Sequence, residues 1–579
     1  MGAPDPRDGE PVEVSGEIDY LEERKHWAYQ PLEFELPNIE NQSWPAGDID
    51  YFVLAKIEQA GLTPTADAAP LAMLRRLSFD LTGLPPSLEQ VARFEALSPG
   101  EVPAAYAALV DELLASPRFG EQWARHWLDG IRFSPNMETS AYYRNWVIKA
   151  LNDDLPYNEF LRWQLAGDLV PHQDPPRAAE AFIATQMIAY NVTEDDFIES
   201  TLEVLGQQVL GISLNCAKCH DHKYDAVSQE DYYALAGIFT SSTAPKAARD
   251  GRKIPGTETQ IITLFDQEPK RIGPTNLLLG GDKSCRGEVI RRRLPKIFFE
   301  GEPPSIESQE QSGRLELANW IGDSGNVLAA RVMVNRVWQR LLGRGIVPTP
   351  NDFGTNGEPP THPQLLDYLA SRLMEQNWSL KRVIREIALS RTYRQSAEAV
   401  EKSYEQDQAN ELYTRAIPKR LQYEQIVDHL LSVAGVLELD MVDPVPAINK
   451  WPQQRRSDKS YGGPRAIYCR GDDQAANTFD GPNSELLMEE RARSVTAPQA
   501  LHFLNGEMVR RISTDTAERV EAIVGKDDRN ELIGTSYRLL LARPPSEAER
   551  ELGLQFIAAH GFERYMHVLL CTNEFIHLN

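Results

Sequence analysis

The chain has 579 residues, in which 60 lysine and arginine residues stand against 85 aspartate and glutamate residues, for a net charge of −25. Its 42% of hydrophobic and 25% of charged residues are typical of a soluble globular protein, and they exclude a collagen-like, mucin-like or wholly disordered chain. The acidic balance argues against nucleic acid as a partner, because nucleic-acid-binding proteins normally present a basic surface. No apolar run reaches the roughly 18 residues of a membrane-spanning helix, so no membrane span is expected.

Residues 1–47 are predicted to be a flexible lead-in and N-terminal segment, because the start of the chain is rich in Pro, Gly and Glu. A first helical domain is predicted over 48–240. At its start Ile49, Phe52 and Ile57 recur at the spacing of one helix face. Further helices of this domain are predicted at Leu71–Leu81, Ala104–Leu114, Phe119–Leu128, Ala141–Leu151, Tyr157–Leu165 and Ala178–Ala189.

Residues 241–312 differ from the rest in their many Gly and Pro residues, and Gln260–Phe265 alternates like a strand. This indicates an irregular connector with a little β structure. A second helical domain is predicted over 313–579, with helices at Arg314–Ile321, Leu328–Leu342, Pro363–Gln376, Leu380–Arg391, Pro418–Ala434, Thr496–Asn505, Arg529–Leu541 and Ser546–Ala559. The predicted fold class is mainly α: two packed helical domains with a loop-rich, slightly β connector.

Cys216, Cys219 and His220 form a C-x-x-C-H sequence. Two thiols at this spacing add across the two vinyl groups of haem, and the histidine that follows supplies an imidazole to the iron. The preceding stretch, Glu199–Leu214, is predicted to be an amphipathic helix, and a Ser-x-x-Asp capping box at 228–231 predicts a helix after the motif. The motif is therefore expected in a short connection between two helices, where haem c can be clamped.

Other uses of these side chains remain open. With His220 and His222, the thiols of Cys216 and Cys219 give four zinc ligands, although seven residues are cramped for a tetrahedral ion. A redox disulfide between Cys216 and Cys219 is a second alternative, although no thioredoxin-like βαβ pattern surrounds the two residues. Structural free thiols are a third alternative. The remaining cysteines are scattered and support no metal site: Cys285, Cys469 and Cys571.

His222 is too close to His220 in the sequence to reach the opposite face of a haem. We expect it to orient the site or to contact a haem carboxylate. Asp221 and Asp225 are expected to hold these imidazoles in place or to be surface turn residues.

For the second iron ligand the sequence offers three histidines: His126 first, then His26 and His362. Haem is attached covalently outside the cytoplasm. The motif therefore predicts a periplasmic or secreted protein whose signal peptide has been removed.

Distinctive segments accompany the motif along the chain. In the first half they are His26–Leu32, Leu74–Pro86, Phe119–Asp129, Gln164–Leu169 and Cys216–Phe239, and in the second half Arg331–Trp338, Gly343–Val347, Asp352–Pro363, Ser390–Ser396 and Thr496–Leu501. On these segments the chain resembles the planctomycete-type cytochrome c-like family, exported proteins built from paired domains of unknown function with a C-x-x-C-H motif. The resemblance covers nearly everything after residue 20.

The resemblance implies a mostly helical, extracytoplasmic protein of polysaccharide-degrading bacteria, often with sulfatase-like neighbours. The chemistry of the family is poorly assigned. Many relatives carry an additional N-terminal cytochrome domain that this chain lacks, and residues 468–473 depart from the more apolar stretch usual there.

A substrate site is predicted between the two domains, near the haem edge. Arg331, Asn335 and Trp338 share one helix face, opposite the Gly- and Pro-rich loop Asp352–His362. Guanidinium and amide groups suit hydroxyl- or sulfate-bearing rings, indole suits their apolar faces, and His362 is a candidate acid or base. The structural alternative is that the helix residues hold the carbonyl groups of ordered loops.

The expected function is that of a haem-dependent oxidoreductase acting on a sugar or glycan. A simple electron carrier needs only roughly 100 residues around its haem, so the remaining length requires another explanation. The alternatives are a non-catalytic scaffold or electron-relay partner of secreted sulfatases and glycosidases, or a zinc-site protein. A redox partner protein is expected as well as the sugar substrate.

Overall fold

The computed structural model describes residues 18–133, 140–170, 197–243, 252–253, 260–261, 264–398, 401–440, 453–454, 461–469, 474–483 and 486–578. Over these ranges the protein is mainly helical with a few small sheets, which confirms the predicted fold class. None of the described helices is long and apolar enough to cross a membrane.

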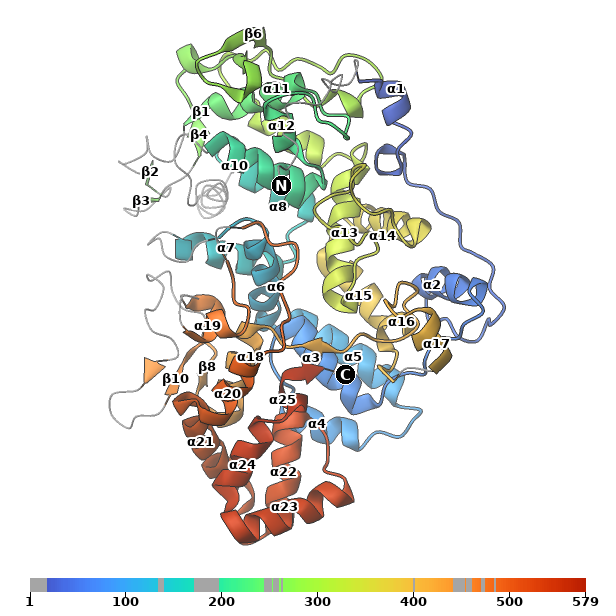
Figure 1. The fold of residues 1–579 in the computed structure, drawn as a ribbon, viewed down its shortest axis with the longest axis vertical. Helices are drawn as coiled ribbons and strands as arrows, with labels where there is room; N and C mark the ends of the chain where they lie inside the picture. The colour runs from blue at the N-terminus through green and yellow to red at the C-terminus, as the bar shows by residue number, and fades with distance from the viewer. Residues whose placement is uncertain are drawn as a thin grey trace, which may run out of the picture.

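The helices before the connector follow the predicted pattern (Figure 1), and short 3-10 or π turns are labelled η. In chain order they are α1 (Tyr20–Glu23), η2 (Trp27–Tyr29), α2 (Asp48–Gln59), α3 (Pro70–Thr82), α4 (Leu88–Glu95), α5 (Val102–Ala115), α6 (Pro117–Asp129), α7 (Ser140–Asn152), α8 (Tyr157–Ala166), α10 (Phe197–Glu203), η4 (Val204–Leu210), η5 (Leu214–Lys218) and α11 (Gln229–Thr240). The helix predicted at Ala178–Ala189 lies outside the described residues. The capping box of Ser228 and Asp231 is present at the start of α11, as predicted.

The connector contains short strands: β1 (Ser242–Thr243), β2 (Arg252–Lys253), β3 (Gln260–Ile261), β4 (Phe265–Asp266), β5 (Thr275–Leu278) and β6 (Arg286–Ile290). They pair antiparallel as β1 with β4, β2 with β3, and β5 with β6. The turns η7 (Pro269–Arg271), η8 (Leu279–Gly281) and η9 (Lys296–Phe298) lie among them. This confirms a loop-rich, slightly β connector.

After the connector the chain is helical again. The helices are α12 (Arg314–Ile321), α13 (Val327–Leu342), α14 (Pro363–Glu375), α15 (Leu380–Leu389), α16 (Arg391–Arg394), α17 (Glu401–Gln406), α18 (Tyr423–Ala434), α19 (Gln474–Thr478), α20 (Ala497–Asn505), α21 (Glu507–Val524), α22 (Arg529–Leu541), α23 (Glu547–His560), α24 (Phe562–Leu570) and α25 (Asn573–Ile576), with the turn η10 (Ala466–Tyr468). The strands β7 (Lys419–Arg420) and β11 (His577–Leu578) pair with each other, and β8 (Leu437–Glu438), β9 (Gln453–Gln454) and β10 (Tyr461–Pro464) form a small sheet in the order β8-β10-β9.

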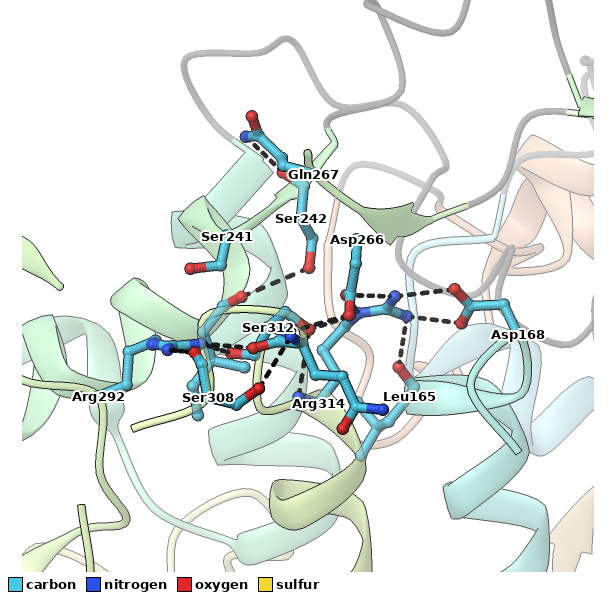
Figure 2. Close-up of polar contacts among 12 residues, drawn as sticks. Leu165, Asp168, Ser241, Ser242, Asp266, Gln267, Arg292, Ser308, Ser312 and Arg314 are labelled. Atoms are coloured by element: carbon cyan, nitrogen blue, oxygen red, sulfur yellow. Dashed lines mark hydrogen bonds and ion pairs between the residues drawn. The ribbon is translucent and has the colours of Figure 1, made fainter. Parts of the chain in front are cut away.

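Arg314, at the start of α12, ties the connector to the first helical segment (Figure 2). Its buried guanidinium lies 2.8 and 2.9 Å from the two carboxylate oxygens of Asp168, and 2.8 Å from Asp266 Oδ1 in β4. It also donates to the carbonyl of Leu165 at 3.0 Å. Two carboxylates and a carbonyl thus match a guanidinium that would be costly to bury alone.

The apolar side chains form two main cores, which divide the chain at a different place from the predicted segments. Most of the larger core lies between Ala28 and Tyr413, and it joins helices on both sides of the connector, such as α8 with α12 and α5 with α15. The smaller core lies mainly between Leu421 and Leu578, with Phe79 of α3 inserted. In Figure 1 the helices α20–α24 accordingly form a block at the lower end of the molecule.

Candidate functional site

The C-x-x-C-H sequence lies in a tight connection between α10 and α11. The predicted helix Glu199–Leu214 is interrupted, because α10 continues as the π-helix η4, which ends at Gly211. Gly211 has a left-handed φ of 61°, and a Cβ at this position would lie 2.9 Å from Val332 and 3.0 Å from Phe353. Glycine is therefore required both by the backbone conformation and by the close approach of the second helical segment.

Residues of the second helical segment also hold the end of this π-helix by hydrogen bonds. Arg336 of α13 donates to the carbonyl of Gln207 at 2.9 Å, and the N–H of Phe353 donates to the carbonyl of Gly211 at 2.6 Å. A helix end leaves carbonyl groups without partners in the helix itself. The position of the motif is thus fixed from across the connector.

The thiols of Cys216 and Cys219 are both free and exposed. His220 is exposed too, and its Nδ1 lies 2.6 Å from the carbonyl oxygen of Asp221. A carbonyl oxygen only accepts, so Nδ1 carries the proton and Nε2 keeps its lone pair. This is the tautomer that iron- or zinc-binding histidines use, and the three side chains therefore fit covalent haem.

The backbone of the motif is held in place by residues at the start of α11. Gln229 Nε2 and the hydroxyl of Tyr233 donate to the carbonyl of Lys218 at 2.9 and 3.1 Å. The carboxylate of Asp221 accepts the N–H of Gln229 at 2.8 Å. Asp221 therefore supports the motif through both its carbonyl and its side chain.

His222 lies inside the turn that follows the motif. Its Nδ1 accepts the N–H groups of Tyr224 and Asp225 at 3.2 and 2.7 Å, and its Nε2 lies 3.6 Å from Asp225 Oδ2. The other carboxylate oxygen of Asp225 accepts the N–H of Thr355 at 2.8 Å. His222 thus orients the turn, and the turn binds the loop 352–362 through Asp225.

Ionisable groups from three segments of the chain surround Asp225. Burial lowers the pKa of His26, while the carboxylates of Asp225 and Asp352 act in the opposite direction. Burial raises the pKa of Asp352 and of Glu23, and the charge of Asp225 adds to both effects. The charges of these groups are thus coupled to one another around the turn that follows the motif.

Two family models match the chain. Residues 48–244 match PSCyt2, described as a protein of unknown function (DUF1549), and residues 313–557 match PSD1, described as a protein of unknown function (DUF1553). The chain carries both domains. They are the pair found in the planctomycete cytochrome-like proteins that the sequence resembles. No curated protein and no solved structure matches the chain.

The C-x-x-C-H motif belongs to the PSCyt2 domain, and the chain on either side of it is bound by the PSD1 domain: Arg336 and Phe353 contact the segment before the motif, and Thr355 contacts Asp225 after it. The first residues of the loop 352–362 thus contact the segments that flank the motif, at Gly211 and Asp225. The rest of the predicted substrate site lies elsewhere.

Arg331 and Asn335 of the PSD1 domain are buried among backbone groups. Arg331 lies 2.7 Å from Asp367 and donates to the carbonyls of Trp27, Ala28, Gln30 and Pro31 at 2.8 to 3.3 Å. Asn335 exchanges two hydrogen bonds with the backbone of Val347, at 3.0 and 2.8 Å. These contacts agree with the alternative interpretation, in which the helix residues hold the carbonyl groups of ordered segments. Neither side chain faces a cleft.

Trp338 and His362 are buried as well, and both rings contact Tyr413 at centroid distances of 5.3 Å. Burial lowers the pKa of His362 to about 3, so its imidazole is neutral. His362 lines a separate pocket of about 340 Å³ with Phe52 and Lys56 of α2. Trp338 has no exposed face on which a sugar ring can stack.

His126 is partly buried in α6, where its ring meets that of Trp123 edge to face. Burial and the nearby charges of Arg340, Arg125 and Arg491 hold its pKa well below the usual value. Those neighbours belong to α6, to α13 and to the chain near residue 491. Its described surroundings thus do not include the motif.

Within the described ranges, no three His, Cys, Asp or Glu side chains are grouped so as to hold a metal ion. The zinc alternative through Cys216, Cys219, His220 and His222 stays a prediction. In this conformation His222 is turned into its own loop.

A pocket of about 460 Å³ beside the motif was not predicted from the sequence. Lys218 and Gly281 line it, and a Cβ on Gly281 would lie 2.7 Å from Cys219 Sγ. The pocket is formed where the β5–β6 hairpin packs against α11. A contact between segments this far apart in the chain leaves no short sequence motif, so the pocket could not be predicted.

Proposed function

We propose that Cys216 and Cys219 attach haem c covalently, that His220 is its axial ligand, and that the protein is a periplasmic or secreted oxidoreductase acting on a sugar or glycan. The observation that carries the proposal is the C-x-x-C-H spacing together with the state of His220. Its Nδ1 donates to the Asp221 carbonyl at 2.6 Å, which leaves Nε2 available for iron. When bound, haem supplies one-electron redox chemistry.

The protein's own contribution is to orient the ligand and to fix the thiols. The carbonyl of Asp221 sets the rotation of the His220 ring and makes Nε2 a better donor to a metal. Gln229 and Tyr233 donate hydrogen bonds to the carbonyl of Lys218, which lies between the two cysteines. These bonds hold the backbone that connects the two thiols in one conformation. Both domains take part, because the PSD1 domain holds the π-helix that leads into the motif.

His26 is the candidate second ligand to test first. It is half-buried, and the groups that act on its pKa include Asp225, in the turn directly after the motif. His362 is buried and His126 partly buried, and both lie among other elements. Replacing His26 by Ala is expected to shift the haem absorption spectrum, whereas His362→Ala is expected to leave it unchanged.

Electron relay is the second candidate function, and the exposure of the motif favours it. Because Cys216, Cys219 and His220 are all exposed, a haem bound to them lies within reach of a redox partner protein.

The two functions differ in their response to sugars. The ferric protein is mixed with a panel of mono- and oligosaccharides, and reduction of the haem is followed in the visible spectrum. Reduction supports the oxidoreductase, and silence across the panel with tight binding to a secreted sulfatase or glycosidase supports the relay or scaffold.

Haem attachment itself is tested by expression with a haem-maturation system. The protein is expected to keep its haem in a denaturing gel stained for peroxidase activity, and Cys216→Ala with Cys219→Ala is expected to lose the stain. Cys285→Ala is the matched control, since Cys285 is also exposed but lies outside the motif. A colourless, zinc-containing product from the same system would contradict the proposal.

A further inference from the structure

The pocket beside Cys219 has a cationic rim in a strongly acidic protein. Its lining includes Lys218, Arg271, Lys283 and Arg286, against a single carboxylate, that of Glu199. Glu199 is already paired with Lys218, at 2.5 Å. The pocket therefore has a positive local charge, although the chain as a whole carries a net charge of −25. A positive pocket attracts anions.

Two of these cations are available to a ligand. Arg271 and Arg286 are exposed, and neither guanidinium has a hydrogen bond or ion pair to any residue in the described part of the chain. A guanidinium offers paired N–H donors that match the oxygens of a carboxylate or a sulfate. Asp282, in the turn between β5 and β6, accepts the N–H and hydroxyl of Ser284 at 2.8 and 2.7 Å.

The wall of the pocket is aromatic and polar. Tyr232 and Tyr233 of α11 meet edge to face with centroids 5.1 Å apart, and both line the pocket. The hydroxyl of Tyr233 donates a hydrogen bond to the carbonyl of Lys218, whereas the hydroxyl of Tyr232 makes no hydrogen bond within the described residues. Both side chains are buried, at 3% and 4% exposure, so they shape the wall of the pocket and leave ligand recognition to the exposed guanidinium groups.

The size and position of the pocket agree with a small ligand at the redox centre. A volume of about 460 Å³ is that of an ordinary ligand pocket, large enough for one or two sugar rings. Gly281 forms part of its wall and adjoins Cys219. In Figure 1 the elements involved, α10, α11 and β6, lie together at the upper end.

We propose that this pocket binds a saccharide that carries a sulfate or carboxylate group, with Arg271 and Arg286 on the anion. The saccharide and the placement at a redox centre rest on the proposed function, whereas the binding of an anion does not. The proposal names the substrate class that the haem-attachment site would serve. The substrate site is thus placed at this pocket, and not at Arg331, Asn335 and Trp338.

Binding is measured by calorimetry on the haem-loaded protein at low ionic strength, with galactose 6-sulfate, galacturonate, galactose and inorganic sulfate as probes. One of the two acidic sugars is expected to bind, and its affinity is expected to fall as salt is added, because exposed charges are screened. The comparison of the two acidic sugars distinguishes sulfate from carboxylate. Arg271→Gln with Arg286→Gln is expected to weaken binding at least tenfold.

Arg291→Gln is the matched control, since Arg291 lies on the same connector, outside the pocket, with its side chain 77% exposed and 3.9 Å from Glu307. It is expected to leave binding unchanged. Equal binding of galactose and the acidic sugars, or binding of inorganic sulfate as tight as that of the sugar sulfate, would overturn the proposal. So would acidic-sugar binding that occurs only when Cys216 and Cys219 are replaced by Ala, because the cations would then be serving the carboxylates of haem. The gel stain for haem is independent of all these results, so a failure here is distinguishable from a failure of the proposed function.

Discussion

The helix α13 packs against η4, which leads into the C-x-x-C-H motif, yet the polar residues of the helix and of the motif have opposite environments. Arg331 and Asn335 on α13 are at most 2% exposed, and their hydrogen bonds end on the protein's own backbone. Cys216, Cys219 and His220 are exposed, and the imidazole keeps one nitrogen uncommitted. The comparison teaches that polar residues at helical spacing indicate a site only when their partners are missing, because buried polar groups are normally satisfied.

The largest effect is expected on the buried side of this comparison. Arg331→Ala removes the partner of Asp367 and the donor to four carbonyls of the N-terminal segment, so we expect a loss of about 3–5 kcal/mol in the free energy of unfolding. Urea unfolding measures it. Arg291→Ala, at an exposed ion pair, is the control and is expected to change stability by less than about 1 kcal/mol. Normal stability of Arg331→Ala would show that Arg331 is free for a ligand.

The junction between the two regions gives the next effect. Gly211→Ala places a residue with Cβ at a φ of 61° and 2.9 Å from Val332, and we expect a loss of about 2–3 kcal/mol from strain and overpacking together. Gly61→Ala is the control, because Gly61 has a φ of 66° and nothing within 4 Å of the added Cβ. It isolates the backbone cost, about 1 kcal/mol. Equal losses in the two variants would mean that the contact with the PSD1 domain does not constrain the loop.

The buried histidine of the loop 352–362 makes stability depend on pH. Burial lowers the pKa of His362 to about 3, from about 6.5 in an unfolded chain. Between these values the unfolded chain binds a proton that the folded protein does not, so stability is full above about pH 6.5 and falls as the pH drops. From pH 7 to pH 5 the loss due to His362 is about 2 kcal/mol.

Urea unfolding at the two pH values checks this for His362→Gln, in which the difference between pH 7 and pH 5 is expected to shrink by that amount. His126, which is partly buried, and His429, which is buried, also have lowered pKa values and supply the remaining dependence. The exposed His560 on α23 provides the control, as His560→Gln is expected to keep the full difference. An unchanged difference in His362→Gln would show that its imidazole is protonated in the folded protein.

The smallest effect is expected at the motif. In protein made without haem, Cys216→Ser with Cys219→Ser is expected to change the free energy of unfolding by no more than about 0.5 kcal/mol, as for other exposed positions. Thermal unfolding measures it, beside Cys469→Ser as the contrasting variant at a buried cysteine. A large loss at the motif would mean that its thiols stabilise the fold and would remove the contrast with α13.

Local structure was predicted well where the signals were local. The helix Arg314–Ile321 has the bounds that its periodicity predicts, and the capping box of Ser228 and Asp231 is present at α11. Two helices without strong sequence signals, α21 and α24, were missed; their apolar faces are completed by packing against each other. The π-helix η4 was also missed, because its shape depends on Arg336 and Phe353, more than a hundred residues further along the chain.

The sequence by itself determined the helical segments, the irregular connector and the candidate haem-binding residues, because periodicity, caps and the C-x-x-C-H spacing involve residues close together in the chain. Only the tertiary structure decided which polar side chains are available. It buried Arg331, Asn335 and Trp338 against distant segments, and it brought Arg271 and Arg286 of the connector beside Tyr232. Whether a charged group is buried or exposed depends on partners far away in the sequence, and local patterns carry no record of them.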